Sequence, residues 1–279
     1  MEDLDVKRKE ISTITPIQVK NELGQYLTPC PLANFMASMF DGNKMQNCTI
    51  LDPGAGLGVL TDALTRHIHH IKNSSISSIT AVELDDRLIE DLNKTIKMTN
   101  HGDIEVIHAD FLEKALNWVQ FCPDKRFSHI IMNPPYKKIL SSSLQRKLLR
   151  SAGIETVNLY SGFVGLCIML LKSHGELVAI IPRSFCNGPY YKPFRRLILK
   201  NTQIMQIHLF DSRKNNFSDD DVLQENVIIK LTNEKPCTHD IKISRSTDYT
   251  LQDYTEKAFS SDEIVKPNDP EMFIRVPEA

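Results

Sequence analysis

The segment Asn133-Pro134-Pro135-Tyr136 combines residue types that could activate an amine. Each proline fixes its own φ, lacks an N–H and keeps the preceding residue out of the α conformation, so this peptide is held extended. The Asn133 side-chain oxygen and the Pro134 carbonyl could then accept both protons of one exocyclic amine. Two such acceptors would draw the lone pair back from the ring to nitrogen. Tyr136 offers a flat face for stacking a base.

A glycine-rich segment, LDPGAGLG at residues 51–58, could bring a ligand close to the main chain. Glycine permits the sharp turn and the close approach that such binding needs. The dinucleotide fingerprint Gly-x-Gly-x-x-Gly is not met, because Val59 stands where the last glycine belongs. Asp52 ends the preceding apolar run, which places its carboxylate at the crevice where doubly wound sheets bind ligands.

Two further acids follow apolar runs later in the chain. Glu83 comes 31 residues after Asp52, where an acid is placed to bind ribose hydroxyls. Asp110 and Phe111 follow the next apolar run, and a short acid beside an aromatic ring could hold an adenine. Three acids at three successive strand ends indicate a nucleoside site more strongly than any single turn does.

The elements that must position these residues alternate between strands and helices. We expect strands at 49–52, 79–83, 104–108, 127–132, 177–181, 204–210 and 226–231. Helices are expected at 57–71, 87–97 and 159–172. This alternation predicts an α/β fold, a doubly wound and mostly parallel sheet with helices on both faces. Beyond about Asn233 the chain turns polar, which predicts a linker or the start of a further domain over 236–279.

Composition sets the remaining bounds. The 279 residues are 41% hydrophobic and 24% charged, which is ordinary for a globular protein and excludes bulk disorder. No apolar run approaches the ~20 residues of a membrane span, and the charged N-terminus lacks a signal core, so a cytoplasmic protein is expected. The six cysteines form no CxxC pair, so neither a metal site nor a disulfide framework is predicted.

Charge is distributed unevenly along the chain. The net charge is −2, yet residues 137–200 contain 11 basic and 2 acidic side chains. A basic middle in an acidic chain indicates a local face for anions. Its members follow the Asn133 segment and the later Pro182-Arg183-Ser184 segment, where they could grip phosphates.

Taken together, these motifs resemble a known family. Asp-Pro-Gly-Ala-Gly followed by Asn-Pro-Pro-Tyr is similar to the S-adenosylmethionine-dependent N6-adenine DNA methyltransferases. Gly24-Gln25-Tyr26-Leu27-Thr28-Pro29, ahead of the glycine-rich turn, resembles the first motif of the γ subgroup, the TaqI-like enzymes of restriction–modification systems. The resemblance covers roughly residues 20–232. It implies a Rossmann-like catalytic domain over 1–235 that binds S-adenosylmethionine.

The resemblance also implies residue roles. Asp52, Gly54, Ala55 and Gly56 would lie against the methionine part of the cofactor, with Tyr26, Thr28 and Pro29 closing over it. Glu83 and Leu84 would hold the ribose, and Asp110 and Phe111 the cofactor's adenine. Asn133, which also borders the cofactor, would hold the target adenine with Pro134, Pro135 and Tyr136. Phe217 would stack on its other face, while Lys137, Lys138 and Arg183 would contact DNA.

The implied reaction transfers a methyl group directly to N6 of a flipped-out adenine in double-stranded DNA, with no covalent enzyme intermediate. Three alternatives stay open: protein-glutamine N5 methylation, ribosomal RNA adenine-N6 methylation, and a non-catalytic DNA-binding subunit. Only about 45 residues follow Asn233, which is short of a typical domain. We therefore expect sequence recognition to come from a missing target-recognition domain or from a separate partner.

Overall fold

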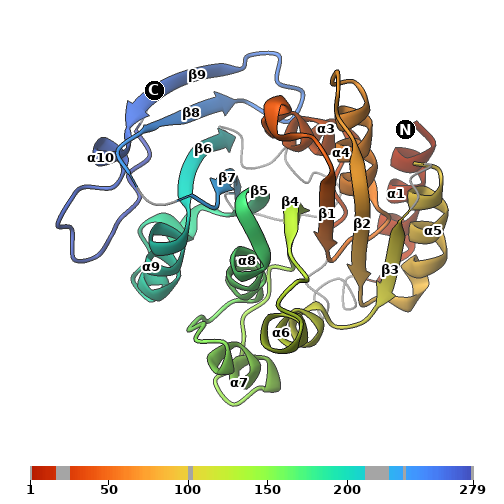
Figure 1. Cartoon of the computed structure of the whole chain (residues 1–279), viewed down its shortest axis with the longest axis horizontal. Coiled ribbons are helices and arrows are strands. Elements are labelled where there is room, and N and C mark those ends of the chain that lie inside the picture. The colour runs from red at the N-terminus through yellow and green to blue at the C-terminus, as the bar shows by residue number, and fades with distance from the viewer. Residues whose placement is uncertain (1, 17–25, 100–102, 211–225, 235–236, 278–279) are drawn as a thin grey trace.

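A nine-stranded sheet forms the centre of the computed structural model, which describes residues 2–16, 26–99, 103–210, 226–234 and 237–277. The strands lie in the order β3-β2-β1-β4-β5-β7-β6-β8-β9 (Figure 1). They are β1 (Cys48–Pro53), β2 (Ile76–Glu83), β3 (Ile104–His108), β4 (Phe127–Met132), β5 (Leu171–Pro182), β6 (Gln203–Phe210), β7 (Asn226–Thr232), β8 (Asp240–Ser246) and β9 (Thr255–Ser260).

The pairings make the sheet mostly parallel. Neighbours from β3 to β5 run parallel, as do β6 and β8, whereas β7 is antiparallel to β5 and β6, and β9 is antiparallel to β8. Because β1 to β4 are parallel, their carboxyl ends meet at one edge, where Asp52, Glu83 and Asn133 stand. The doubly wound α/β fold predicted from the sequence is confirmed.

Helices cover both faces of the sheet (Figure 1). One face carries α3 (Cys30–Ser38), α4 (Val59–His69) and α5 (Asp86–Lys97), and α1 (Glu2–Ile14) lies against α5 through a Lys7–Asp91 ion pair. The other carries α6 (Phe111–Phe121), α7 (Leu144–Ser151), α8 (Leu159–Leu170) and α9 (Lys192–Asn201). A last short helix, α10 (Ser261–Ile264), follows β9.

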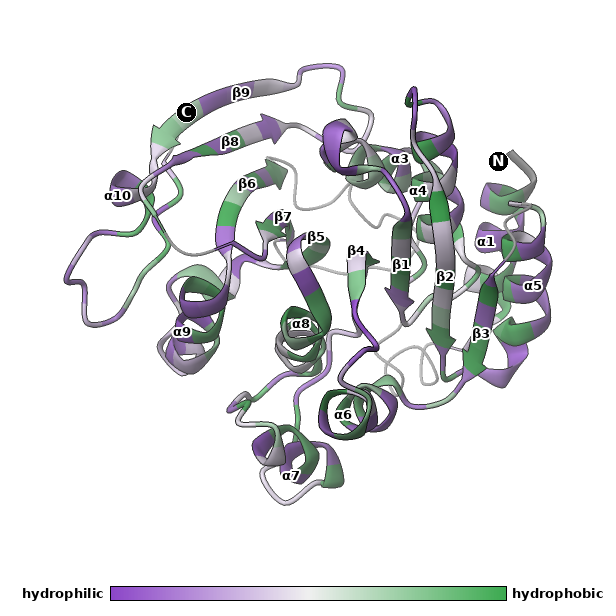
Figure 2. Ribbon diagram, viewed as in Figure 1, coloured by the Kyte–Doolittle hydropathy of each residue, from purple (hydrophilic) through white to green (hydrophobic). Residues whose placement is uncertain are grey.

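Strand alternation divides the core into two layers. Ile131, Val178 and Ile180 face the α3–α4 side, whereas Ile130 and Leu177 face the α8 side. Helix α8 is buried almost all round because it packs between the sheet, α6 and α9. Figure 2 shows the hydrophobic residues gathered on the central strands and on α8.

Two expectations about the elements differ from the structure. Helix α8 ends at Leu170 and β5 begins at Leu171, so the strand starts earlier than residue 177. The register explains why the early part was missed: Phe127 faces Leu171 but His129 faces Glu176, which leaves residues 172–175 as an irregular polar insert.

The expected boundary near residue 235 does not coincide with the edge of the sheet. Strand β8 pairs with β6, and its Ile241 and Ile243 are buried in the core. Strand β8 begins with exposed polar residues and includes the buried serines Ser244 and Ser246, and the edge strand β9 is largely exposed, so the polar side chains of these two strands conceal the pattern. Across the described residues, no helix is long and apolar enough to cross a membrane.

Candidate functional site

Three glycines shape the turn after β1. Gly54, Gly56 and Gly58 have φ values of 74°, 57° and 80°, in the left-handed region that disfavours other residues. A Cβ at Gly58 would lie 3.0 Å from Leu92 Cδ1, so this glycine also lets α4 pack closely on α5. The amides of Gly54 and Ala55 both donate to the Val82 carbonyl, at 2.8 and 3.0 Å. The turn is therefore fastened to β2 beside Glu83.

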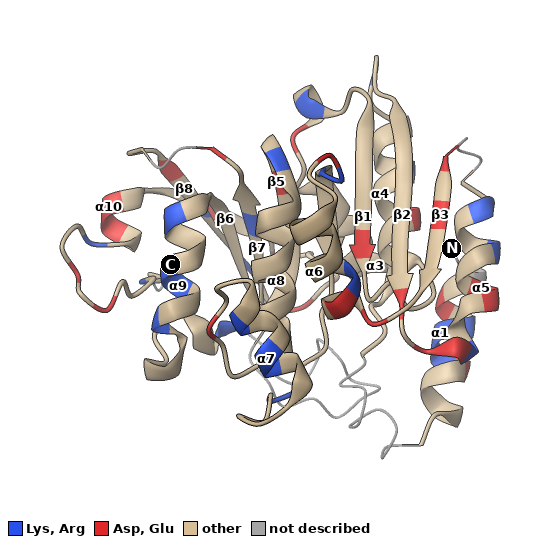
Figure 3. Ribbon diagram, turned by 60° about the horizontal axis from the view of Figure 1, so that its bottom comes forward, with Lys and Arg blue, Asp and Glu red and all other residues tan. Residues whose placement is uncertain are grey.

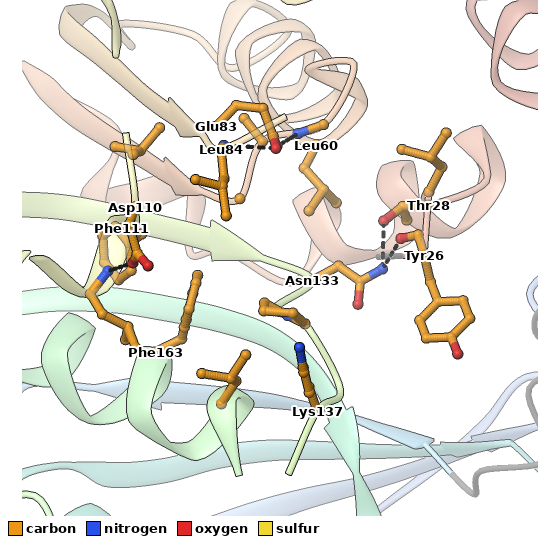
Figure 4. A pocket seen from close by; sticks show the side chains of 18 of the residues that line it. Tyr26, Thr28, Leu60, Glu83, Leu84, Asp110, Phe111, Asn133, Lys137 and Phe163 are labelled. Atoms are coloured by element: carbon orange, nitrogen blue, oxygen red, sulfur yellow. Dashed lines mark hydrogen bonds between the residues drawn. The ribbon is translucent and has the colours of Figure 1, made fainter. Parts of the chain in front are cut away.

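A cavity of about 200 Å³ opens at the carboxyl ends of β1 to β4 (Figure 4). The predicted residues that line it are Tyr26, Thr28, Gly54, Ala55, Gly56, Glu83, Leu84, Asp110, Phe111, Asn133, Pro135 and Lys137. Segments more than 100 residues apart in the chain thus meet at one site, as the positions of the motifs at strand ends predict. The cavity has the concave, largely apolar lining with few polar groups that is typical of small-molecule sites.

Glu83 is held by the backbone around it. Its Oε2 accepts from the Gly56 amide at 2.7 Å, and its Oε1 accepts from the amides of Leu84 and Asp85, both at 2.8 Å. Burial raises the pKa of this carboxyl, although the three backbone bonds oppose the rise. A carboxylate has about four lone-pair positions, so Glu83 keeps about one for a ligand hydroxyl.

Asp52 is fully buried behind the glycine turn. Its Oδ2 accepts from the Thr61 hydroxyl at 2.7 Å, while its Oδ1 has no partner among the described residues. Burial raises the pKa of Asp52 to about 7, with a further contribution from the neighbouring Glu83. A buried carboxylate oxygen without a donor is costly, which is why burial favours the protonated form here; Asp52 does not line the cavity and supports the glycine turn from behind.

The third acid begins α6. Asp110 Oδ1 accepts from the Leu112 amide at 2.8 Å and so caps the helix, which leaves Oδ2 for another partner. Phe111 packs on Phe163 of α8, with ring centroids 4.8 Å apart. Both rings line the cavity, so one wall is aromatic and one edge is acidic. Such a wall suits a planar heterocycle with an exocyclic donor.

Asn133 leaves β4 with its amide fixed. Its Nδ2 donates to the Tyr26 carbonyl at 2.8 Å and to the Thr28 hydroxyl at 3.1 Å (Figure 4). Because both amide protons are used, Oδ1 is turned the other way, as an acceptor on the cavity side. Residues 26 and 28 thus orient the side chain that the sequence singled out for accepting an amine proton.

The remaining residues of the tetrapeptide serve as its support. Pro134 is buried, and Tyr136 is half-buried with its hydroxyl donating to the Ile180 carbonyl at 3.0 Å. Burial raises the pKa of Tyr136 well above its ordinary value. Its ring lies 5.8 Å from that of Tyr26 and 6.4 Å from that of Tyr160. Tyr136 is thereby held beside the cavity by β5 and the 26–29 segment.

Other predicted residues lie outside the cavity lining. Pro29 is the N-cap of α3, and Lys138 forms an isolated β-bridge with Asn158. Arg183 starts the 3₁₀ turn Arg183–Cys186 after β5. Phe217 falls outside the described residues. The stacking role of Phe217 and the DNA contacts of Lys138 and Arg183 therefore stay predictions.

Part of the basic stretch is structural. Arg146 and Arg150 both pair with Glu155, and Lys192 pairs with Glu271 at 2.8 Å. Arg195 is fully buried, donating to the carbonyls of Phe185, Gly188 and Glu271 at 2.7 to 3.0 Å. These side chains hold helices and the C-terminal segment in place, so sequence charge alone overstated the anion-binding face.

The cavity also contains residues that the sequence left unassigned: Leu27, Leu57, Val59, Leu60, Val82, Ala109, Leu112, Gln145, Leu159 and Phe163. Phe163 lies in the helix expected over 159–172, but that pattern does not show which of its side chains would line a cavity. Gln145 is the second residue of α7, and no feature of the sequence marks it. No cluster of three or more His, Cys, Asp or Glu suited to a metal occurs among the described residues.

Comparison with known proteins places this geometry in a family. The model of the Eco57I restriction-modification methylases matches residues 57–217. The chain is 42% identical to the Type II methyltransferase M.BsuBI of Bacillus subtilis and 35% identical to M.PstI of Providencia stuartii, over 98% of this chain in both cases. The alignments cover 56% and 55% of those relatives, so the chain spans about half their length.

Solved structures agree on the fold. A putative class I S-adenosylmethionine-dependent methyltransferase from Listeria monocytogenes superimposes with a TM-score of 0.69 at 15% identity, covering 89% of this chain and 73% of that one. A modification subunit of a putative type I restriction enzyme from Vibrio vulnificus gives 0.70 at 15% identity, covering 90% and 58%. The sequence matches the family model, and the fold and the site are of the kind expected. The chain therefore belongs to the Eco57I restriction-modification methylase family.

Proposed function

We propose that this chain is the catalytic part of a restriction–modification DNA methyltransferase that transfers a methyl group from S-adenosylmethionine to N6 of adenine. The observation that carries the proposal is the Asn133 amide, whose two protons are held by Tyr26 and Thr28 so that its oxygen faces the cavity. An acceptor fixed in this way suits an amine that must release its lone pair. The family match and the M.BsuBI and M.PstI relatives support DNA as the substrate.

The residues present fit S-adenosylmethionine. The glycine turn after β1 lines the cavity where the methionine end would lie, whereas Asp52 is fully buried behind that turn and would act on the ligand only through it. Glu83 retains about one lone-pair position for a ribose hydroxyl, and Asp110 retains Oδ2 for the adenine amine. The Phe111–Phe163 wall offers apolar contact to the adenine ring. When bound, S-adenosylmethionine supplies an electrophilic methyl group on a sulfonium.

The residues of this chain then act by positioning. Asn133 Oδ1 and the Pro134 carbonyl accept hydrogen bonds from the two N6–H groups of a flipped adenine. These bonds localise the lone pair on the nitrogen. Pro135 contributes no N–H that would compete for these acceptors. Tyr136, anchored on Ile180, supports one side of the base. Holding the amine in line contributes much of the rate, because preorganisation removes an entropic cost from the reaction.

We further propose that recognition of a DNA sequence requires a target-recognition domain outside these 279 residues. The support is that the chain spans about half the length of M.BsuBI and M.PstI, while the described residues of β8 and β9 are taken up by the catalytic sheet. A chain that methylates one defined sequence efficiently without any addition would contradict this part.

The testing experiment is transfer of a labelled methyl group from S-adenosylmethionine to unmethylated plasmid DNA, followed by nucleoside analysis. The expected product is N6-methyladenine. Label in 4-methylcytosine would refute the assigned base. Protein and ribosomal RNA are offered as substrates in parallel reactions. Label found only in protein glutamine would support glutamine-N5 methylation, and label found only in ribosomal RNA would support rRNA adenine-N6 methylation. Cofactor binding without transfer to any of them would indicate a non-catalytic subunit.

A further inference from the structure

Two leucines beside the cavity remain in solvent where their apolar neighbours are buried. Leu140 is 74% exposed and Leu144 is 57% exposed. Ile139 and Leu149, on the same segment and on the same helix, are only 8% and 1% exposed. Single exposed leucines are common, but two of them four residues apart form a local apolar projection.

The turn that carries these leucines is well braced. The Ser143 amide and hydroxyl both donate to the Leu140 carbonyl, at 3.1 and 2.8 Å. The Ser143 hydroxyl also caps α7 by accepting from the Arg146 amide. The Ile139 amide donates to the Val157 carbonyl at 2.8 Å, which ties the turn to the chain entering α8. The leucines are therefore presented on a fixed support.

This projection stands at the mouth of the proposed active site. Lys137 and Gln145, which flank the turn, line the same cavity as Asn133. Lys138 and Lys147 are exposed on either side of it, and Figure 3 shows basic residues along α7, of which Arg146 and Arg150 pair with Glu155. An apolar tip within a basic surround is complementary to nucleic acid, because the cations meet phosphates while the tip meets bases.

Resting on the proposed function, we propose that Leu140 and Leu144 form an apolar wedge that enters the duplex beside the target adenine. An adenine can reach Asn133 only after it leaves the helical stack, and this costs stacking and pairing. Proteins that unstack base steps insert apolar side chains such as leucine to offset that cost. The wedge takes up the vacated space, and it also removes two exposed leucine side chains from water.

The test compares variants on two substrates. Sequencing of DNA methylated by the unchanged chain first locates a modified adenine. One duplex then contains this site with the adenine paired to thymine, and a second has an abasic position opposite the same adenine, so that less pairing is lost on flipping. Leu140→Ala, Leu144→Ala and the double variant are measured on both. Phe121→Ala is the matched control, since Phe121 is 72% exposed at the far end of α6.

We expect the double variant to lose at least about tenfold in kcat/KM on the paired duplex and less than about threefold on the abasic duplex, with the control unchanged. Equal losses on both substrates would assign the leucines to general support of the site and overturn the wedge. Unchanged rates on both would overturn it too and favour contact with another protein. If the unchanged chain transfers no methyl group to DNA, the proposed function fails first.

Discussion

The substitution Thr28→Val removes one of the two acceptors that orient the Asn133 amide while keeping the shape of the side chain. Thr28 is 6% exposed, so solvent cannot easily replace its hydroxyl. The Tyr26 carbonyl, at 2.8 Å, becomes the sole remaining acceptor, and the second amide proton loses its bond of 3.1 Å. A neutral hydrogen bond of this kind contributes about 1 kcal/mol net, and an unpaired buried donor costs more.

The amide of Asn133 then spends part of its time turned away from the substrate. If the oriented conformation of the amide loses about 1 to 2 kcal/mol of stability, the reaction becomes roughly 5- to 30-fold slower. The assay is single-turnover methyl transfer to DNA at saturating S-adenosylmethionine, with cofactor affinity measured in parallel by calorimetry. We expect the rate to fall and the cofactor affinity to change by less than about threefold, because valine keeps the size and shape of the threonine side chain at the cavity wall.

Two controls separate orientation from general damage. Thr28→Ser keeps the hydroxyl and should keep most of the rate. Thr65→Val removes a similarly buried hydroxyl, which donates to the Asp62 carbonyl at 3.0 Å within α4, and should leave transfer unchanged. If Thr28→Val transfers methyl groups at the unchanged rate, or if it loses only cofactor affinity, then Thr28 does not orient Asn133 for the reaction.

Four other substitutions test the rest of the site and the basic stretch. In the folded protein burial raises the pKa of Asp52 from its ordinary value of about 4 to about 7, so the folded state binds the extra proton and loses stability as pH rises from about 4 to 7. Asp52→Asn should therefore raise the melting temperature more at pH 8 than at pH 5 and weaken cofactor binding; an equal effect at both pH values would contradict the assigned burial. Glu83→Gln should raise the cofactor Kd by about tenfold or more, since the amide cannot accept all three backbone bonds, with a rate at saturation within about threefold. Arg195→Ala should lower the melting temperature by several degrees without changing the salt dependence of DNA binding. Lys147→Ala should instead reduce by about one the slope of the logarithm of DNA affinity against the logarithm of salt concentration. The reverse pattern would show that Arg195 contacts phosphate.

Features set by a local pattern were predictable from the sequence. Apolar runs bounded by turn residues placed β1 to β4 within a few residues. Because parallel strands end at one edge, the same reasoning brought Gly54, Glu83, Asp110 and Asn133 to one cavity. The resemblance to a family added Tyr26 and Thr28, which no periodicity would have placed there.

Features set by tertiary contacts were not predictable. The amide of Asn133 is oriented by residues more than 100 positions earlier in the chain. Arg195 carries the same charge as a phosphate-binding arginine, and only its burial against three carbonyls shows its structural use. Strand β9 lies at the sheet edge and β8 beside it, and the polar residues of β8, including the buried Ser244 and Ser246, interrupt the apolar pattern that would reveal a strand.

In the proposed reaction Asn133 acts on the substrate amine and not on the cofactor. The most direct test measures Asn133→Ala in two ways, as the cofactor Kd by calorimetry and as the single-turnover rate of N6-methyladenine formation in DNA. We expect a rate reduced by at least about a hundredfold with a cofactor Kd within about threefold of the unchanged chain. A parallel loss of cofactor affinity, or a rate that survives the substitution, would contradict it.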